Sequence, residues 1–169
     1  PEGFTLEEIQ SRIRKNAPIS ITKKAADFKQ AYDFFADAPD DASLEGYLFP
    51  DTYQYERDGT AEETVLKKML DNFDEKLSEE IRQEIQRQEK TVFNIITMAS
   101  IIEREVITDE DMKLASGILW KRLSVGMPLQ VDASVAYAVG HSVLTYDDLK
   151  VDSPYNTYAN EGLPPGPIG

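Results

Sequence analysis

The uncharged segment 91–102, followed directly by Glu103, says more about the fold than any other part of this sequence. A run of this length and apolar content predicts a central helix that is buried over most of its circumference. At helical spacing, Ile96, Ala99 and Ser100 share one stripe with Glu103, so the carboxylate is expected to point where its apolar neighbours point. Apolar surroundings raise the pKa of a carboxyl group, as a general acid requires near neutral pH. The alternative is that the helix surfaces here and that the Glu-Arg-Glu sequence is its solvated end.

The overall charge excludes several kinds of partner. Among 169 residues, 31 are acidic and 18 are basic, which gives a formal net charge of -13 at pH 7. Such a surface repels phosphate backbones and anionic membrane surfaces, so we expect no nucleic-acid partner and no direct membrane binding. A hydrophobic content of 41% is still sufficient for a real core, in one domain or in a domain with a small appendage.

The residue types needed for metal, phosphate and thiol chemistry are missing. The sequence has no cysteine, which excludes thiol nucleophiles, zinc–thiolate sites and disulfides but decides nothing about the cellular compartment. Its one histidine, His141, lies in a turn-like Gly-His-Ser sequence and lacks a second histidine to complete a transition-metal site. There is no glycine-rich phosphate loop and no Gly-x-Ser-x-Gly elbow. We therefore expect neither a metal nor another cofactor.

Membrane and export signals are not visible in this sequence. No apolar run reaches the roughly 18–20 residues that cross a bilayer, and no signal peptide is recognisable. The abrupt Pro-Glu-Gly start and Pro-Ile-Gly end lead us to expect that both ends are cut from a longer protein.

Local signals predict several helices. The segments 5–8 and 60–63 both have the spacing of a capping box, in which two side chains satisfy each other's backbone amides. Ser78 and Thr108 are further N-cap candidates. A helix is expected after each of these signals, at 22–35, in the apolar segment and at 133–139, where Gly140 closes it. The helix after residue 60 is expected to bury Val65, Leu66, Met69, Leu70 and Phe73.

Two segments are predicted to be extended. Segment 44–55 carries aromatic side chains but is interrupted by Gly46 and Pro50, so its strand should be short, bulged or at a sheet edge. Segment 129–132 is also short and extended. With the helices, these segments predict an α+β fold, a helix-rich domain with a few short strands. A turn at 38–41 marks the boundary between a small N-terminal unit and this main domain.

The tail from Ser153 to Pro167 is predicted to be a structured loop. Repeated Pro and Gly preset its backbone, and its Tyr, Asn and Thr side chains suit hydrogen bonds to a sugar. We expect it to fold back beside Glu103 and to form one wall of a glycan cleft. A polyproline segment for partner docking is the alternative.

Four signatures occur in order along the chain: LEGYLFPDTY at 44–53, ASIIERE at 99–105, GMPLQVD at 126–132, and SPYNTY at 153–158 continuing through Pro167. Together they resemble the YceG-like family (MltG) of endolytic murein transglycosylases. The opening at 1–6 also resembles the end of the LysM-like region in that family. The resemblance implies a truncated LysM-like unit over 1–40 and a YceG-like catalytic domain over 41–169 that lacks its C-terminal strands.

The resemblance also implies an activity, that of a lytic transglycosylase. Such an enzyme cleaves the β-1,4 bond between N-acetylmuramic acid and N-acetylglucosamine inside a glycan strand and leaves a 1,6-anhydro end. Glu103 falls on the catalytic glutamate of the family and would act first as acid and then as base for the C6 hydroxyl of the sugar. Ordinary glycosidases need two carboxylates, and an intramolecular nucleophile removes that need. Expected substrate-binding residues within the signatures are Glu45, Gln130, Asp132, Tyr155, Asn156 and Tyr158.

The implied partners are peptidoglycan glycan strands and cell-wall synthases. The resemblance places the work at the outer face of the bacterial cytoplasmic membrane, with a single N-terminal anchor helix outside this chain. Two features depart from the family: an Asn-Pro-Gly turn with terminal strands does not follow the Pro-Pro-Gly sequence, and Lys121 stands where Asn is frequent. The alternatives are a non-catalytic glycan-binding or scaffolding module of cell-wall synthesis, and a conventional hydrolase.

Overall fold

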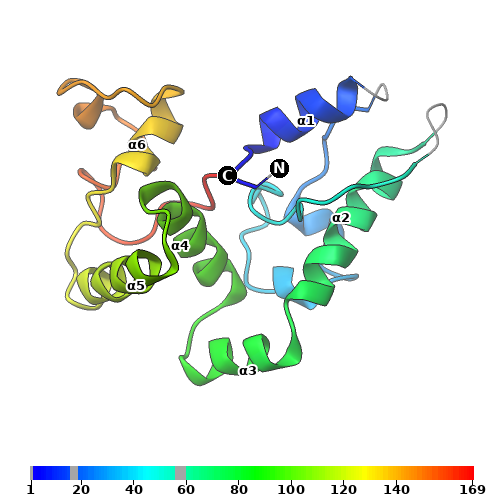
Figure 1. Cartoon of the computed structure of the whole chain (residues 1–169), viewed down its shortest axis with the longest axis horizontal. Coiled ribbons are helices and arrows are strands. Elements are labelled where there is room, and N and C mark those ends of the chain that lie inside the picture. The colour runs from blue at the N-terminus through cyan, green and yellow to red at the C-terminus, as the bar shows by residue number, and fades with distance from the viewer. Residues whose placement is uncertain (1, 16–18, 56–59) are drawn as a thin grey trace. The chain divides into compact units, whose positions relative to one another are not determined.

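The computed structural model describes residues 2–15, 19–55 and 60–169 (Figure 1). The α-helices in these ranges are α1 (Leu6–Arg14), α2 (Glu62–Lys76), α3 (Glu79–Arg87), α4 (Val92–Glu105), α5 (Asp109–Ser124) and α6 (Asp132–Val139). The short 3₁₀ helices are η1 (Ala25–Phe28), η2 (Asp33–Phe35) and η3 (Asp148–Lys150). No helix in the described ranges is long and apolar enough to cross a membrane.

The chain divides into two compact units, residues 1–95 with Gly169 and residues 96–168, and the division falls inside α4. The sequence analysis divides the chain at residue 40, into a LysM-like unit and a catalytic domain. That division follows the domains of the family and not the compact units of the structure, and it stays a prediction.

No β-strand occurs in the described part of the chain, so the fold there is helix-rich and the short strands of the α+β prediction are not found. The backbone explains this for both predicted segments. In the first, the amide of Tyr47 donates to the carbonyl of Leu44 (3.1 Å) and Gly46 has a φ of 78°, which makes a turn. In the second, Gln130 has a φ of 54°, a left-handed conformation that interrupts an extended chain.

Helix α1 begins with the predicted capping box. The amide of Glu8 donates to Thr5 Oγ1 (3.3 Å), and the amide of Thr5 donates to Glu8 Oε2 (2.8 Å). A third acceptor comes from a distant part of the first unit, because Glu45 Oε1 accepts a hydrogen bond from the amide of Leu6 (2.7 Å). Three of the otherwise unpaired groups at this helix start are thus satisfied by side chains.

The predicted helix over 22–35 is instead broken into η1 and η2. The reason is an aromatic cluster in the core of the first unit, which buries the adjacent residues Phe34 and Phe35 together. Ring centroids lie 4.8 Å apart for Phe34 and Phe73 and 4.7 Å apart for Phe35 and Tyr47. Such ring pairs contribute roughly 0.5–1.5 kcal/mol beyond their buried area, which outweighs the weak local preference for a continuous helix.

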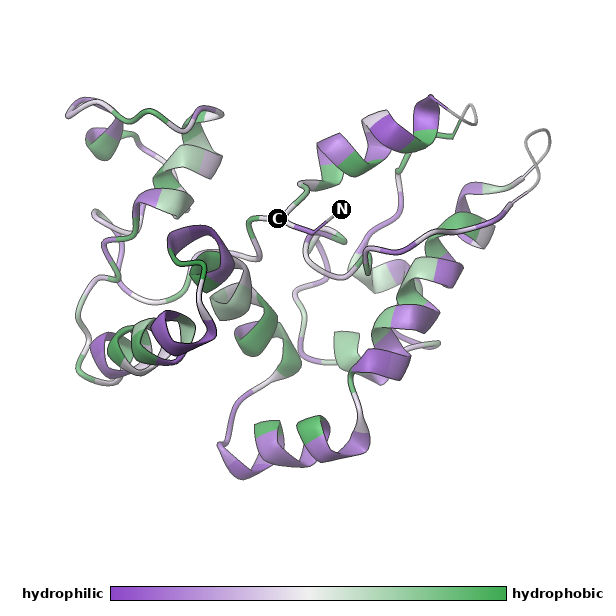
Figure 2. Ribbon diagram, viewed as in Figure 1, coloured by the Kyte–Doolittle hydropathy of each residue, from purple (hydrophilic) through white to green (hydrophobic). Residues whose placement is uncertain are grey.

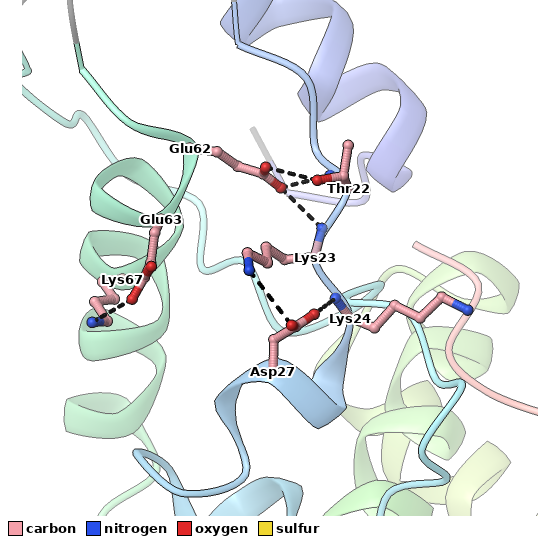
Figure 3. A network of polar contacts seen from close by, with 7 residues as sticks. All are labelled: Thr22, Lys23, Lys24, Asp27, Glu62, Glu63 and Lys67. Atoms are coloured by element: carbon pink, nitrogen blue, oxygen red, sulfur yellow. Dashed lines mark hydrogen bonds and ion pairs between the residues drawn. The ribbon is translucent and has the colours of Figure 1, made fainter.

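Helix α2 buries the predicted face, Val65, Leu66, Met69, Leu70 and Phe73. Its predicted capping box does not form: Ala61 is the N-cap, and no side chain caps the helix from that position. Figure 3 shows Glu62 turned toward Thr22 and Lys23. Its carboxylate accepts hydrogen bonds from the amides of Thr22 (2.5 Å) and Lys23 (2.9 Å) and from Thr22 Oγ1 (2.9 Å). The carboxylate that the predicted box requires, that of Glu63, instead pairs with Lys67 Nζ (2.7 Å).

Helices α3 and α4 differ in hydropathy. Figure 2 shows α3 as mostly hydrophilic and α4 as mostly hydrophobic. Ser78 caps α3 by accepting a hydrogen bond from the amide of Ile81 (3.4 Å), and Ile85 is the buried residue of that helix.

The core of the second unit is built by one face of α4 together with segments that follow it. The predicted cap of α5 forms, because the amide of Asp111 donates to Thr108 Oγ1 (3.2 Å). Gly140 closes α6 in the left-handed conformation, with a φ of 78°. The buried core residues are Met98, Ile101, Ile102, Leu119, Leu129, Val131, Ala133 and Ile168.

Candidate functional site

Glu103 lies in the last turn of α4 and is exposed to solvent. The residues of the predicted stripe do lie on one side of the helix, but this side is mostly open to solvent. Ala99 is exposed, Ile96 is half-buried, and only Ser100 is buried. The buried side of the helix carries Thr97, Met98, Ile101 and Ile102. The expected desolvation of Glu103 by its own helix is therefore wrong, because the apolar residues that face the core lie on the other side. The carboxylate is instead accessible to a ligand from solvent.

The end of the tail is bound to α4 close to Glu103. The amide of Ile168 donates to Ser100 Oγ (2.9 Å), and Arg104 Nη1 donates to the carbonyl of Ile168 (3.2 Å). Ser100 Oγ in turn donates to the carbonyl of Thr97 (2.9 Å), so this buried hydroxyl is fully used. Ile168, the residue directly after the predicted loop, therefore docks one turn before Glu103, and the cleft wall expected from residues 153–167 stays a prediction.

Glu105 fixes the other side of the same turn of α4. Its Oε1 accepts a hydrogen bond from the amide of Ala133 (3.0 Å), at the start of α6. The N-cap residue of α6 is Val131, whose side chain cannot accept a hydrogen bond. Sequence reasoning missed this role of Glu105. The available signal was a helix start that had no capping side chain of its own.

Gln130 is held by hydrogen bonds to two groups. Its left-handed backbone directs its amide to the carbonyl of Thr157 (3.0 Å), and its side-chain oxygen accepts a hydrogen bond from Arg122 Nη2. Arg122 Nε also donates to the carbonyl of Pro128 (2.8 Å). Arg122 was not predicted from the sequence, although an arginine in the last turn of a helix commonly bonds to the carbonyls that follow it. Gln130 itself is exposed and presents polar atoms to solvent.

Asp132 and Tyr158 form a pair across the site. Tyr158 Oη donates to Asp132 Oδ1 (2.6 Å). The hydrogen bond to Asp132, burial of the ring and the charges of Asp132 and Glu105 raise the pKa of Tyr158 to about 12. The phenol is therefore a neutral hydrogen-bond donor throughout the physiological range. Asp132 is exposed and Tyr158 half-buried, so both edges of the pair are open to a ligand.

The other two predicted tail residues lie in different environments. Tyr155 is half-buried and its ring packs against that of Tyr137, with centroids 5.0 Å apart. Asn156 is fully buried. Its Nδ2 donates to the carbonyls of Leu149 (3.0 Å) and Val151 (2.9 Å), and its Oδ1 accepts from the amide of Tyr158 (3.0 Å).

The expectation that Asn156 faces solvent is therefore wrong, because both of its amide hydrogens and its side-chain oxygen bond to nearby backbone groups. Glu45 is a similar case in the first unit. It is only 4% exposed, and its carboxylate binds the start of α1. In this arrangement neither side chain is open to a sugar.

A buried hydroxyl pair that sequence reasoning missed joins the tail to the site. Ser134 Oγ and Thr157 Oγ1 lie 2.8 Å apart, and the amide of Val131 donates to Thr157 Oγ1 (3.0 Å). These bonds join Thr157 to Val131, the residue between Gln130 and Asp132, and to Ser134. Within the described residues, no group of three or more His, Asp or Glu side chains is arranged to hold a metal ion.

The comparisons with known proteins agree on one family. The sequence profile of the YceG-like family matches residues 1–169. The chain belongs to the YceG-like family. An endolytic murein transglycosylase from Bacillus subtilis is 41% identical over 127 residues, which cover 74% of this chain and 35% of that protein. An endolytic murein transglycosylase from Streptococcus pneumoniae is 39% identical over 132 residues, 74% of this chain and 24% of that protein.

The family fold is also known from a crystal structure. A YceG-like protein from Listeria monocytogenes superposes with a TM-score of 0.84 at 37% sequence identity, over 100% of this chain and 60% of that one. The chain thus spans about a third or less of the curated relatives and somewhat more than half of the crystallised one.

Proposed function

We propose that this chain contains the catalytic part of an endolytic murein transglycosylase, with Glu103 as its general acid and base. The observation that carries the proposal is the exposed carboxylate of Glu103 at the end of the open face of α4. Membership of the YceG-like family and the names of the curated relatives support the reaction class.

The proposed reaction needs one carboxyl group and no water. Protonated Glu103 gives its proton to the glycosidic oxygen of N-acetylglucosamine as the bond from that oxygen to C1 of N-acetylmuramic acid breaks. The resulting carboxylate takes the proton of the C6 hydroxyl as O6 forms a new bond to C1. Glu103 ends as it began, and the products are a 1,6-anhydro end and a free 4-hydroxyl.

The hydrogen bonds of the neighbouring carboxylates support a mechanism with one catalytic acid. Glu105 accepts a hydrogen bond from the amide of Ala133, and Asp132 accepts one from Tyr158 Oη. Both therefore have structural partners, whereas a conventional glycosidase needs a second carboxylate to activate water or to attack the sugar. Bound glycan would cover Glu103 and exclude water from it, which favours the protonated acid.

Substrate contacts are proposed for the open residues around Glu105 and Tyr158. Gln130, Asp132, Tyr155 and Tyr158 present an amide, a carboxylate and two phenol groups, which are suited to sugar hydroxyl and acetamido groups. Buried Asn156 is proposed as a positioning residue, because it fixes the backbone amide of Tyr158. For Glu45 a role in shaping the first unit fits its burial better than direct sugar contact.

The organisation of the longer protein is part of the proposal. We infer a LysM-like unit over residues 1–40 and a YceG-like catalytic domain over residues 41–169. Because murein lies outside the cytoplasmic membrane, we place the enzyme at the outer face of that membrane, held by an N-terminal anchor and working beside cell-wall synthases. The names of the relatives support the substrate in this picture.

The decisive experiment is incubation of the chain with purified uncrosslinked glycan strands, followed by mass spectrometry of the products. New 1,6-anhydro ends inside strands, absent with Glu103→Gln, are the expected result. New reducing ends would indicate a conventional hydrolase. Binding of the strands without new ends would favour a non-catalytic glycan-binding module and would overturn the proposal.

A further inference from the structure

A row of exposed apolar side chains along α5 has no role in the site described above. Ile107 is 93% exposed, Leu114 66%, Ile118 59% and Val125 58%. Single exposed apolar residues are ordinary, but several large ones on one side of a helix mark an interaction surface.

The row has the spacing by which one helix packs on another. The α5 stripe consists of positions that follow one another in alternating steps of four and three residues: Ile107, Asp111, Leu114, Ile118, Lys121 and Val125. Four of these positions lie within α5, and Ile107 and Val125 flank its two ends. This is the a and d pattern of a heptad, which keeps the four positions within α5 on one face of the helix.

The α5 stripe is complementary to itself in the reverse direction. A two-fold axis through its centre places Leu114 of one copy opposite Ile118 of the other. The same operation places Asp111 opposite Lys121, so apolar side chains meet apolar ones and an acid meets a base. Gly117 flanks the centre, and a Cβ atom built there would have no heavy atom within 4 Å, which leaves room for close approach of a second helix.

We propose that the α5 stripe is a docking surface for a second copy of this chain, packed antiparallel about a two-fold axis. The order of Asp111 and Lys121 along the stripe is the reason for proposing a second copy as the partner. An unrelated apolar helix could cover Leu114 and Ile118, but it would have no reason to match the order of Asp111 and Lys121. A single helix pair buries less than the roughly 1,600 Å² of a standard interface, so the dimer should be weak and dependent on concentration.

The test is sedimentation velocity of the whole chain over a series of protein concentrations. Asp111→Lys and Lys121→Asp each place like charges opposite one another twice per dimer, and each should raise the dissociation constant roughly tenfold. The double variant restores opposite charges in the reverse order and should recover the dimer. Because Asp111 also accepts a hydrogen bond from Thr108 Oγ1 (2.7 Å), thermal melts of every variant are compared.

An apolar variant keeps the test independent of that helix cap. Ile118→Lys replaces an exposed side chain at the centre of the stripe, so it should fold normally and abolish the dimer. The matched control is Val143→Lys, which alters a side chain 83% exposed outside the stripe and should leave the dimer unchanged. The proposal is overturned by a chain that stays monomeric at all concentrations, or by a dimer that Ile118→Lys leaves intact. Failure of the double variant to recover the dimer while it remains folded would contradict the antiparallel pairing.

Discussion

The carboxylate of Glu105 accepts a hydrogen bond from the backbone amide of Ala133 across 3.0 Å. Helix α4 thereby caps α6, whose own N-cap residue Val131 has no side-chain acceptor. Glu103 is two residues before one partner of this bond, and Asp132 immediately precedes the other. The bond therefore fixes the acid proposed for catalysis relative to one of the residues proposed for substrate binding.

Removal of this cap should loosen α6. Glu105→Ala leaves the amide of Ala133 without its acceptor, and we expect a loss of about 1 kcal/mol in the free energy of unfolding, as for other N-caps. Glu105→Gln keeps an acceptor oxygen and should lose less than half as much. Urea unfolding of both variants measures the difference, and equal stability of Glu105→Ala and wild type would contradict the capping role.

Glu103→Gln should abolish glycan cleavage without changing the fold. Gln keeps the shape of the side chain but has no proton to give, and general acid–base help contributes roughly 10²–10⁴-fold to a rate. Because Glu103 is exposed, the melting temperature should stay within about one degree of wild type. Glu110→Gln, an exposed glutamate in the first turn of α5, is the control and should cleave normally. Wild-type turnover by folded Glu103→Gln would remove the assignment.

Asn156→Ala should destabilise the chain as well as slow the reaction. The variant leaves the carbonyls of Leu149 and Val151 and the amide of Tyr158 without their partner. Unsatisfied buried groups cost about 1–3 kcal/mol, which denaturant unfolding detects. Asn160 makes two similar amide bonds to backbone carbonyls but is exposed, so water can replace them in Asn160→Ala and the loss should be smaller. Equal losses in the two variants would mean that burial of Asn156 contributes nothing.

The Tyr158–Asp132 hydrogen bond predicts that the free energy of unfolding falls at high pH. The pKa of Tyr158 is raised from 10.0 to about 12 in the folded chain, so the folded state holds this proton more tightly than the unfolded state. The resulting stability is fully present below pH 10 and is lost as the pH rises through the folded pKa. The stability difference between wild type and Tyr158→Phe should therefore be constant below pH 10 and shrink above it. A constant difference from pH 8 to 11.5 would exclude the coupling.

The contacts of Glu62 predict that the free energy of unfolding falls at low pH. Burial opposes ionisation of this carboxyl, but hydrogen bonds from the amides of Thr22 and Lys23 outweigh it and lower the pKa from its ordinary value of 4.5. The stabilising contribution is present above that value and is lost as the pH falls through the lower folded pKa. Unfolding of wild type and Glu62→Gln should therefore differ most near neutral pH and converge in acid. A difference that grows on acidification would show that the contact does not favour the charged form.

Features set by neighbours along the chain could be predicted from the sequence. The capping box of Thr5 and Glu8, the cap of Thr108 and the closure of α6 by Gly140 each involve residues within about one helical turn. The stripe that joins Ala99 and Glu103 follows from helical periodicity alone. Local geometry and hydrogen bonding fix such features whatever the rest of the chain does. The four signatures likewise indicate the YceG-like family by themselves, because each is a run of adjacent residues.

Only the tertiary structure decided which side of each element is buried and which local signal is overridden. Glu62, at the start of α2, accepts hydrogen bonds from the amides of Thr22 and Lys23, forty and thirty-nine residues away, and no local signal indicates this contact. Ser100 lies on the same stripe as Glu103 but is buried, and it accepts a hydrogen bond from the amide of Ile168, sixty-eight residues away. Periodicity shows that a stripe exists, but burial depends on what packs against it, and that is determined by contacts between distant residues.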